Sequence, residues 1–254
     1  MQRNTVSAML LALGGTVLAE LWCLDGVRAQ TSVTPAAVGI PGVPWSQTLD
    51  RQTNLPVQNL GAGRWSVGQV VLDTKSRTIA FPAAVNMDRA AVEYLLVAEG
   101  GKTHESILKT GAKPFDIHVA MLLLGARAAT TSNPAIFYDP TQSIPGDTIE
   151  VELAWRDGNS EVASPAASWI FNSETERPMS QGPWAYNGSQ FVEGEFVAQQ
   201  EGSIASVMTD PNALINNPRS GRENDAIWHV RSNTVPPVGT SVEVRIRLLN
   251  AKGP

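Results

Sequence analysis

The sequence contains almost no cysteine: Cys23 is the only one in 254 residues, and it lies within the first 29. These 29 residues have the features of a secretory signal segment, with Arg3 in a short polar start and an uncharged apolar run from Ala8 to Ala19. The run is shorter than the roughly 18 residues needed to span a bilayer. Val27-Arg28-Ala29 places small residues before a cleavage point. We therefore predict an exported protein, periplasmic or secreted after cleavage near Ala29.

A mature chain that has lost Cys23 contains no thiol, which excludes disulfides, thiolate catalysis, iron–sulfur clusters and thiolate metal sites. The alternative of a lipoprotein is disfavoured because the bulky Trp22 stands where a small residue should precede the lipidated cysteine. Basic residues are also few, with 19 Lys and Arg against 24 Asp and Glu, and they form no cluster. This balance excludes nucleic acid as the expected partner. No later stretch is long and apolar enough to predict a transmembrane segment.

Three regions follow from the distribution of proline and glycine. Residues 1–29 are the predicted signal peptide, and residues 30–62 form a Pro/Gly-rich linker or arm without periodicity. Residues 63–250 then form a single globular domain, in which short apolar runs are separated by turn residues. Thr74-Lys75-Ser76-Arg77 reads as a hairpin loop, and Gly100-Gly101 reads as the turn of a second hairpin, between Val92–Val97 and Thr103–Lys109.

Strict alternation of apolar and polar residues marks the strands Ile149–Trp155 and Val242–Leu248. Asp157-Gly158 predicts a hairpin turn after the first of these, and Asn187-Gly188 predicts a tight type I′ turn. One helix is predicted from Phe115 to Leu124. The fold class expected is mainly β or α+β, with antiparallel, sandwich-like sheets and one main helix packed on them.

The predicted helix has one buried stripe. Ile117, Ala120, Met121 and Leu124 follow the i, i+3, i+4, i+7 spacing of a single apolar face. Gly125 stands where a C′ glycine would end the helix.

Two glycine-containing motifs resemble nucleotide-binding loops only in part. Gly101-Lys102-Thr103 lacks the first glycine of a phosphate-binding loop and precedes a strand-like run instead of a helix. Gly61–Ser66 has serine in place of the third glycine of a dinucleotide fingerprint, and it is predicted to be a turn.

The histidines provide the candidate chemistry. His104-Glu105 begins like a zinc-protease motif, but Leu108 stands where the second histidine should be. His104, His118 and His229 are candidate metal ligands from three separate segments, although a hydrogen-bonded structural role is the alternative for each. His104, Glu105 and Ser106 are the candidate catalytic residues, without any Gly-x-Ser-x-Gly nucleophile elbow in the chain.

Aromatic and amide residues supply the candidate ligand-binding positions Trp184, Asn187 and Trp228. Stacking on a peptide or glycan ligand is one role for the tryptophans of the C-terminal half, and burial in the core is the favoured alternative. The segment Asp210–Pro218 is rich in turn formers and has too few carboxylates for calcium, so we predict an ordered loop.

Several of these segments together, in this order, resemble the YdjY-domain family of exported bacterial proteins. They are Glu93-Tyr94-Leu95, Gly101–Ser106, Ile117–Gly125 and Trp184–Ser189, and the similarity covers roughly residues 65–250. The resemblance implies a bacterial envelope or secreted setting and no established activity. Some relatives are associated with iron–sulfur segments, which the cysteine-free mature chain does not support.

Two functional hypotheses remain open. The first is a non-catalytic binding or assembly module of the envelope, with an unknown protein, peptide or glycan ligand. The second is a metal-dependent or His/Glu-based hydrolase that uses His104, Glu105 and His118.

Overall fold

A computed structural model of the chain describes residues 56–129 and 135–249. The predicted signal segment and most of the predicted arm lie outside these residues. The described part is mostly β, with 41% of residues in strands and 14% in helices.

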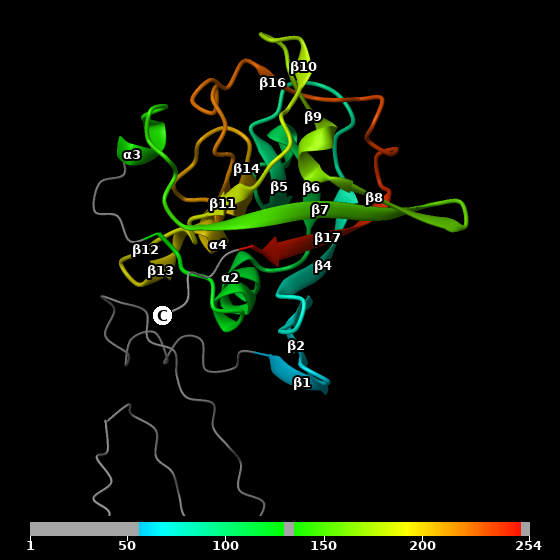
Figure 1. Cartoon of the computed structure of the whole chain (residues 1–254), viewed down its shortest axis with the longest axis vertical. Coiled ribbons are helices and arrows are strands. Elements are labelled where there is room, and N and C mark those ends of the chain that lie inside the picture. The colour runs from blue at the N-terminus through cyan, green and yellow to red at the C-terminus, as the bar shows by residue number, and fades with distance from the viewer. Residues whose placement is uncertain (1–55, 130–134, 250–254) are drawn as a thin grey trace, which may run out of the picture. The chain divides into compact units, whose positions relative to one another are not determined.

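The central feature of the fold is a sheet that closes on itself into an eight-stranded barrel (Figure 1). Closure occurs because β4 pairs with β17 along its length and with β6 at Ala84 and Val85. The predicted sandwich is therefore wrong. Alternation of apolar and polar residues along a strand shows that one face is buried, but it does not show whether the two edges of the sheet pair with each other. In order around the ring, the strands are β4 (Thr78–Val85), β17 (Ser241–Leu248), β7 (Asp147–Asp157), β11 (Trp184–Tyr186), β15 (Ile215–Asn216), β14 (Ser203–Ser206), β5 (Tyr94–Ala98) and β6 (Ser106–Thr110).

Further strands extend this sheet beyond the ring. β3 (Val70–Asp73), β2 (Arg64–Val67) and β1 (Val57–Gly61) continue outward from β4, and β8 (Ser160–Pro165) pairs with the C-terminal half of β7. Two smaller sheets complete the β structure: one of β10 (Arg177–Pro178), β9 (Ile170–Asn172) and β16 (Trp228–Val230), and one of β12 (Phe191–Val192) and β13 (Glu195–Phe196).

The locally encoded hairpins form as predicted. β3 and β4 are antiparallel around residues 74–77, and β7 and β8 are antiparallel around Gly158, whose φ is 60°. The alternation of β17 is also confirmed, because its apolar residues are buried and its polar residues face outward.

Two other predicted hairpins are wrong. β5 and β6 are parallel, and the Gly100-Gly101 turn leads instead into the 3-10 helix η1 (Thr103–Glu105). At the predicted type I′ turn, the N–H groups of Asn187 and Gly188 both donate to the carbonyl oxygen of Leu214, 3.0 and 2.9 Å away. A distant segment therefore takes the hydrogen bonds that a local hairpin would use.

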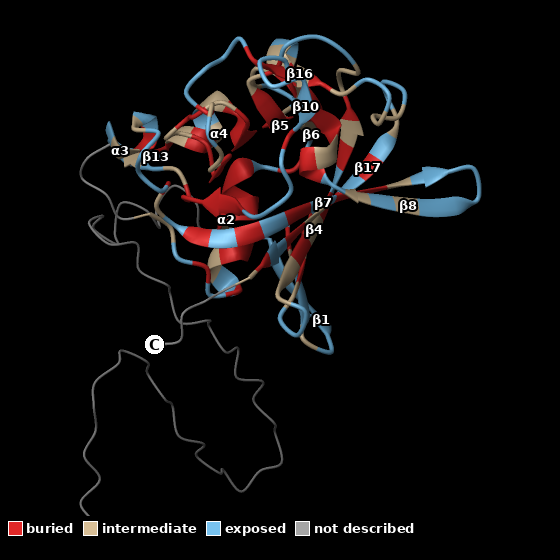
Figure 2. Cartoon of the chain, turned by 45° about the horizontal axis from the view of Figure 1, so that its top comes forward, coloured by how far each residue is buried: buried red, intermediate tan, exposed pale blue. Residues whose placement is uncertain are grey.

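The main helix, α2 (Pro114–Leu123), begins with proline and ends before Gly125, whose φ is 83°. The N–H of Ala126 donates to Met121 and that of Gly125 to Leu122, the pattern of a Schellman cap. The predicted stripe is buried, but so are Phe115, Asp116 and His118. Figure 2 shows α2 largely buried. The helix contacts β2, β3, β4 and α4 (Val197–Glu201). The remaining short helices are α3 (Ala135–Tyr138) and η2 (Ala166–Trp169).

Candidate functional site

His104 and Glu105, two of the predicted catalytic residues, lie side by side on η1. The strand predicted from Thr103 begins only at Ser106, so the two side chains do not point to opposite faces. His104 Nε2 is 3.7 Å from Glu105 Oε2. The His104 side chain is 78% exposed and that of Glu105 is 22% exposed. This pair is therefore open to solvent.

Behind η1, a chain of hydrogen bonds leads into the interior. The Lys102 ammonium donates to the Tyr94 hydroxyl over 2.8 Å, and that hydroxyl donates to Asp210 Oδ2 over 2.8 Å. Burial, and then the Asp210 carboxylate, raise the pKa of Tyr94 well above its ordinary value. The phenol therefore stays protonated and serves as a donor to a buried carboxylate.

Glu93 adds a second carboxylate beside η1. Partial burial, and then the charge of Glu105, raise the pKa of Glu93, while Lys102 lowers it. Two of the segments that carry the family resemblance, Glu93–Leu95 and Gly101–Ser106, thus converge on one group of titratable side chains. Such groups are candidates for functional sites and also occur in structural networks.

The segment Asp210–Pro218 is held by amide hydrogen bonds, as expected for an ordered loop. Asn216 Nδ2 donates to Asn187 Oδ1 and to the Asp210 carbonyl, each over 2.8 Å. Asn187 Nδ2 donates to the Ala213 carbonyl over 2.7 Å. Asn187, a predicted ligand-binding residue, is buried and fastens this loop to the end of β11.

His118 occupies an aromatic pocket inside the molecule. Its Nδ1 is hydrogen-bonded to the Tyr186 hydroxyl at 2.8 Å, and its ring centroid is 4.9 Å from that of Phe196. Burial lowers the pKa of His118 from 6.5 to about 4. The imidazole is therefore neutral at physiological pH.

The remaining predicted residues are engaged by main-chain or packing partners. Ser106 is buried, and its hydroxyl donates to the Leu108 carbonyl over 2.8 Å. His229 Nε2 lies 3.2 Å from the Ala226 carbonyl oxygen in the segment before β16. Within residues 56–129 and 135–249, no group of three or more His, Cys, Asp or Glu side chains is arranged to hold a metal ion.

The predicted burial of the tryptophans in the core is confirmed for three of the four. Trp169, Trp184 and Trp228 are at most 2% exposed, and the Trp228 indole donates to the Gly221 carbonyl over 2.9 Å. Trp155 is half-buried, with its ring centroid 5.4 Å from that of Trp169 in an edge-to-face contact.

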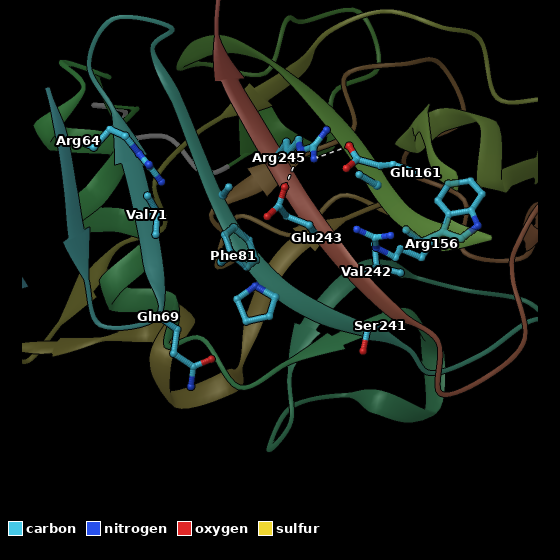
Figure 3. Close-up of a pocket in the computed structure, with 14 residues that line it drawn as sticks. Arg64, Gln69, Val71, Phe81, Arg156, Glu161, Ser241, Val242, Glu243 and Arg245 are labelled. Carbon is cyan, nitrogen blue, oxygen red and sulfur yellow. Dashed lines mark hydrogen bonds and ion pairs between the residues drawn. The ribbon is translucent and has the colours of Figure 1, made fainter. Parts of the chain in front are cut away.

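An open groove of about 560 Å³ crosses the outer face of the sheet formed by β2, β3, β4, β17, β7 and β8 (Figure 3). Along β4, Ile79, Phe81 and Val85 are buried in the barrel, whereas Ala80 and Pro82 face outward. Ala154 of β7 lies across β17 from Pro82, since both pair with Glu243. Small side chains on these neighbouring strands leave the floor of the groove hollow.

Charged side chains surround this floor. Arg245 forms ion pairs with Glu243, Glu161 and Glu152, at 2.6, 2.8 and 3.4 Å, two of which Figure 3 shows as dashed lines. These hydrogen bonds, first that of Glu161, raise the pKa of Arg245 further above its ordinary value. The positive charge of Arg245 is therefore fully compensated.

Arg64 and Arg156 also line the groove, and neither guanidinium group forms an ion pair or a side-chain hydrogen bond with any described residue. Arg64 lies opposite Asp73 on β3, whose pKa is lowered first by the backbone N–H groups of Ser76 and Lys75 and then by the charge of Arg64. Both arginines are exposed. Two guanidinium groups are thus available to a ligand. We did not predict this groove from the sequence. The small residues at every outward position of β4 could have indicated a hollow on that face of the sheet.

The structure defines the protein as a β-rich module built on a closed barrel, with a charged groove on the barrel's outer surface. The chain belongs to the YdjY domain family, whose model matches residues 70–247, and this confirms the predicted resemblance. No curated protein and no solved structure gives a match. Within the described residues, no helix has both the length and the hydrophobicity to cross a membrane.

Proposed function

We propose that the protein is an exported, non-catalytic binding or assembly module of the bacterial envelope, and that it holds its partner in the groove of Figure 3. The observation that carries this proposal is the combination of a hollow floor, with small side chains on β4 and β7, and two exposed arginines, Arg64 and Arg156, whose guanidinium groups form no ion pair within the described residues. The predicted signal segment and the setting implied by the family support the location.

The chemistry of the groove indicates an extended acidic segment of another protein as the partner. Guanidinium groups bind carboxylates through paired hydrogen bonds. The floor of Ala80, Pro82 and Ala154 accepts a close-lying chain with small or apolar side chains. Arg245 does not attract further anions, because three carboxylates already surround it.

A hydrolase is the second candidate function. It is favoured by the exposed His104–Glu105 pair, which lies close enough to Glu93 to influence its pKa. It is weakened by the placement of His118, which is buried against Tyr186, and of Ser106, whose hydroxyl is bound to the main chain. This candidate gains if the groove experiment fails.

The experiment is photo-crosslinking in cells that export the protein. A photoreactive amino acid at Ser241, on the groove, is expected to give one discrete adduct, and the same amino acid at Glu193, on the turn between β12 and β13, is expected to give none. The combined variant Arg64→Glu and Arg156→Glu should abolish the adduct, while the matched exposed variant Lys75→Glu should preserve it. An adduct that survives the double charge reversal, or its absence from Ser241, contradicts the proposal.

A further inference from the structure

The extended sheet has two free edges within the described residues, β1 and β8, because the barrel strands pair on both sides. Natural edge strands are protected against pairing by charges, prolines or bulges. β8 carries Glu161 and Pro165, so its edge is protected. β1 has the sequence Val-Gln-Asn-Leu-Gly, with neither charge nor proline, and all five residues are exposed. The edge of β1 therefore lacks charge and proline protection, and its one irregularity, between Asn59 and Gly61, leaves Val57–Asn59 in regular register with β2.

The main-chain groups of β1 can be assigned to its two sides. The N–H of Gly68 donates to the Pro56 carbonyl over 3.2 Å, and Gln58 lies opposite Ser66 in the same antiparallel ladder. Hydrogen-bonded pairs alternate with non-hydrogen-bonded pairs in such a ladder. Gln58 therefore directs its N–H and C=O toward β2, whereas Val57 and Asn59 direct theirs toward the free edge.

Exposed apolar side chains lie on β1 and on elements close to it in the fold. Among the described residues, four of the seven large exposed hydrophobic side chains lie on β1, β2 and α2. They are Val57 at 38% exposure, Leu60 at 49%, Trp65 at 37% and Leu123 at 44%. Trp65 pairs with Asn59, and α2 packs against β2. Two of these four side chains, those of Val57 and Leu60, therefore lie on the edge strand itself.

We propose that the free edge of β1 pairs antiparallel with β1 of a second copy of this chain. A two-fold axis beside Gln58 places Val57 of each copy opposite Asn59 of the other, so that the outward N–H and C=O groups form hydrogen bonds. In such a pairing a strand pairs with its own copy, and any charge on it is brought onto the same short ladder as an identical charge. β1 carries none, whereas self-pairing of β8 would bring two copies of Glu161 onto one short ladder. This interface lies on different residues from the groove and does not depend on the proposed function.

Disulfide trapping in the full chain tests the register. In a Cys23→Ser background, Gln58→Cys would face its own copy as a non-hydrogen-bonded pair, with Cα atoms about 4.5 Å apart, a separation that a disulfide bridges. Mild oxidation is expected to convert this variant into a covalent dimer. The matched edge variant Glu161→Cys, on β8, is expected to stay monomeric on the same non-reducing gel.

Sedimentation equilibrium tests the dimer itself. The unmodified chain is expected to dimerise, and Val57→Lys combined with Leu60→Lys is expected to raise the dissociation constant at least about tenfold, because it places charges on the edge strand and the two lysines at position 57 become diagonal neighbours across the axis. The control Val192→Lys combined with Val238→Lys changes two exposed apolar residues elsewhere and should leave the constant unchanged. Far-UV circular dichroism verifies that each variant is folded. Two outcomes overturn the proposal. One is a protein that stays monomeric at about 100 µM, as expected if each chain covers its own β1 edge. The other is a dimer in which the Gln58→Cys variant forms no cross-link.

Discussion

Acidification is expected to destabilise the protein through one buried residue, His118. The rings of Phe115, Phe196 and Tyr186 surround its imidazole, and burial lowers its pKa from 6.5 to about 4. In the unfolded chain this histidine binds a proton as the pH falls through its ordinary pKa. In the folded chain it stays neutral until the pH is much lower.

The sign and size of the effect follow from this difference in pKa. Between the two values the unfolded state binds one proton more than the folded state, so stability falls as the pH falls. The contribution is fully present above pH 6.5 and is lost progressively toward about pH 4. At about 1.4 kcal/mol per pKa unit, the complete loss is about 3 kcal/mol, and about 2.5 kcal/mol of it is lost by about pH 4.5.

The assay compares urea unfolding of the native sequence with that of a double variant, His118→Phe and Tyr186→Phe. Removing His118 alone would leave the buried Tyr186 hydroxyl without its partner and add a cost of about 1–3 kcal/mol at every pH. The comparison is needed because Glu93 and Asp116, whose pKa values burial raises, stabilise the fold as the pH falls. The difference between the unfolding free energies of the two proteins is expected to change by about 2 kcal/mol between about pH 7 and about pH 4.5.

His104→Gln provides the matched control, because the side chain of His104 is exposed and its replacement should leave this pH dependence unchanged. The chain has three histidines, so the His118 resonance can be assigned by its loss in the double variant. An unfolding free-energy gap that does not change with pH, or a His118 imidazole that titrates near its ordinary pKa, would refute the reasoning.

Three further substitutions test the buried hydrogen bonds and the backbone. Tyr94→Phe removes the hydroxyl that donates to the buried Asp210, and urea unfolding should show a loss of about 2 kcal/mol; an unchanged midpoint contradicts this. Gly146→Ala places a Cβ 2.0 Å from the Tyr186 carbonyl oxygen at a φ of +122°, so a loss above about 3 kcal/mol is expected in thermal unfolding. Gly194→Ala, at a φ of +83° with no atom within 4 Å of the new Cβ, should cost only about 1 kcal/mol. Equal losses for the two alanine variants would contradict the steric argument.

Local features of the fold could be predicted because neighbouring residues specify them. The hairpins at residues 74–77 and at Gly158, and the end of α2 at Gly125, depend on turn chemistry within a few positions. The failures involve residues far apart in sequence. Glycines at 100 and 101 indicate a change of direction but not that β6 returns parallel to β5. Asn187-Gly188 suits a tight turn, yet Leu214 binds both of its N–H groups.

The candidate site could be predicted only in part, for the same reason. His104 and Glu105 are neighbours in sequence, and the structure brings them together because η1 replaces the expected strand. Lys102 is linked through Tyr94 to Asp210, and no spacing rule reveals a hydrogen bond between residues that lie 116 positions apart, as Tyr94 and Asp210 do. The groove depends on the pairing of β4, β17 and β7, and that order is set by tertiary structure.

The position of β17 also sets an order of events during synthesis. This strand lies between β4 and β7 and pairs with both over most of its length, so the ring stays open until residues 241–248 are available. A chain still emerging from a ribosome therefore presents separate hairpins but no closed barrel. Closure is a late step, and a protein truncated before β17 would leave the facing edges of β4 and β7 exposed to aggregation.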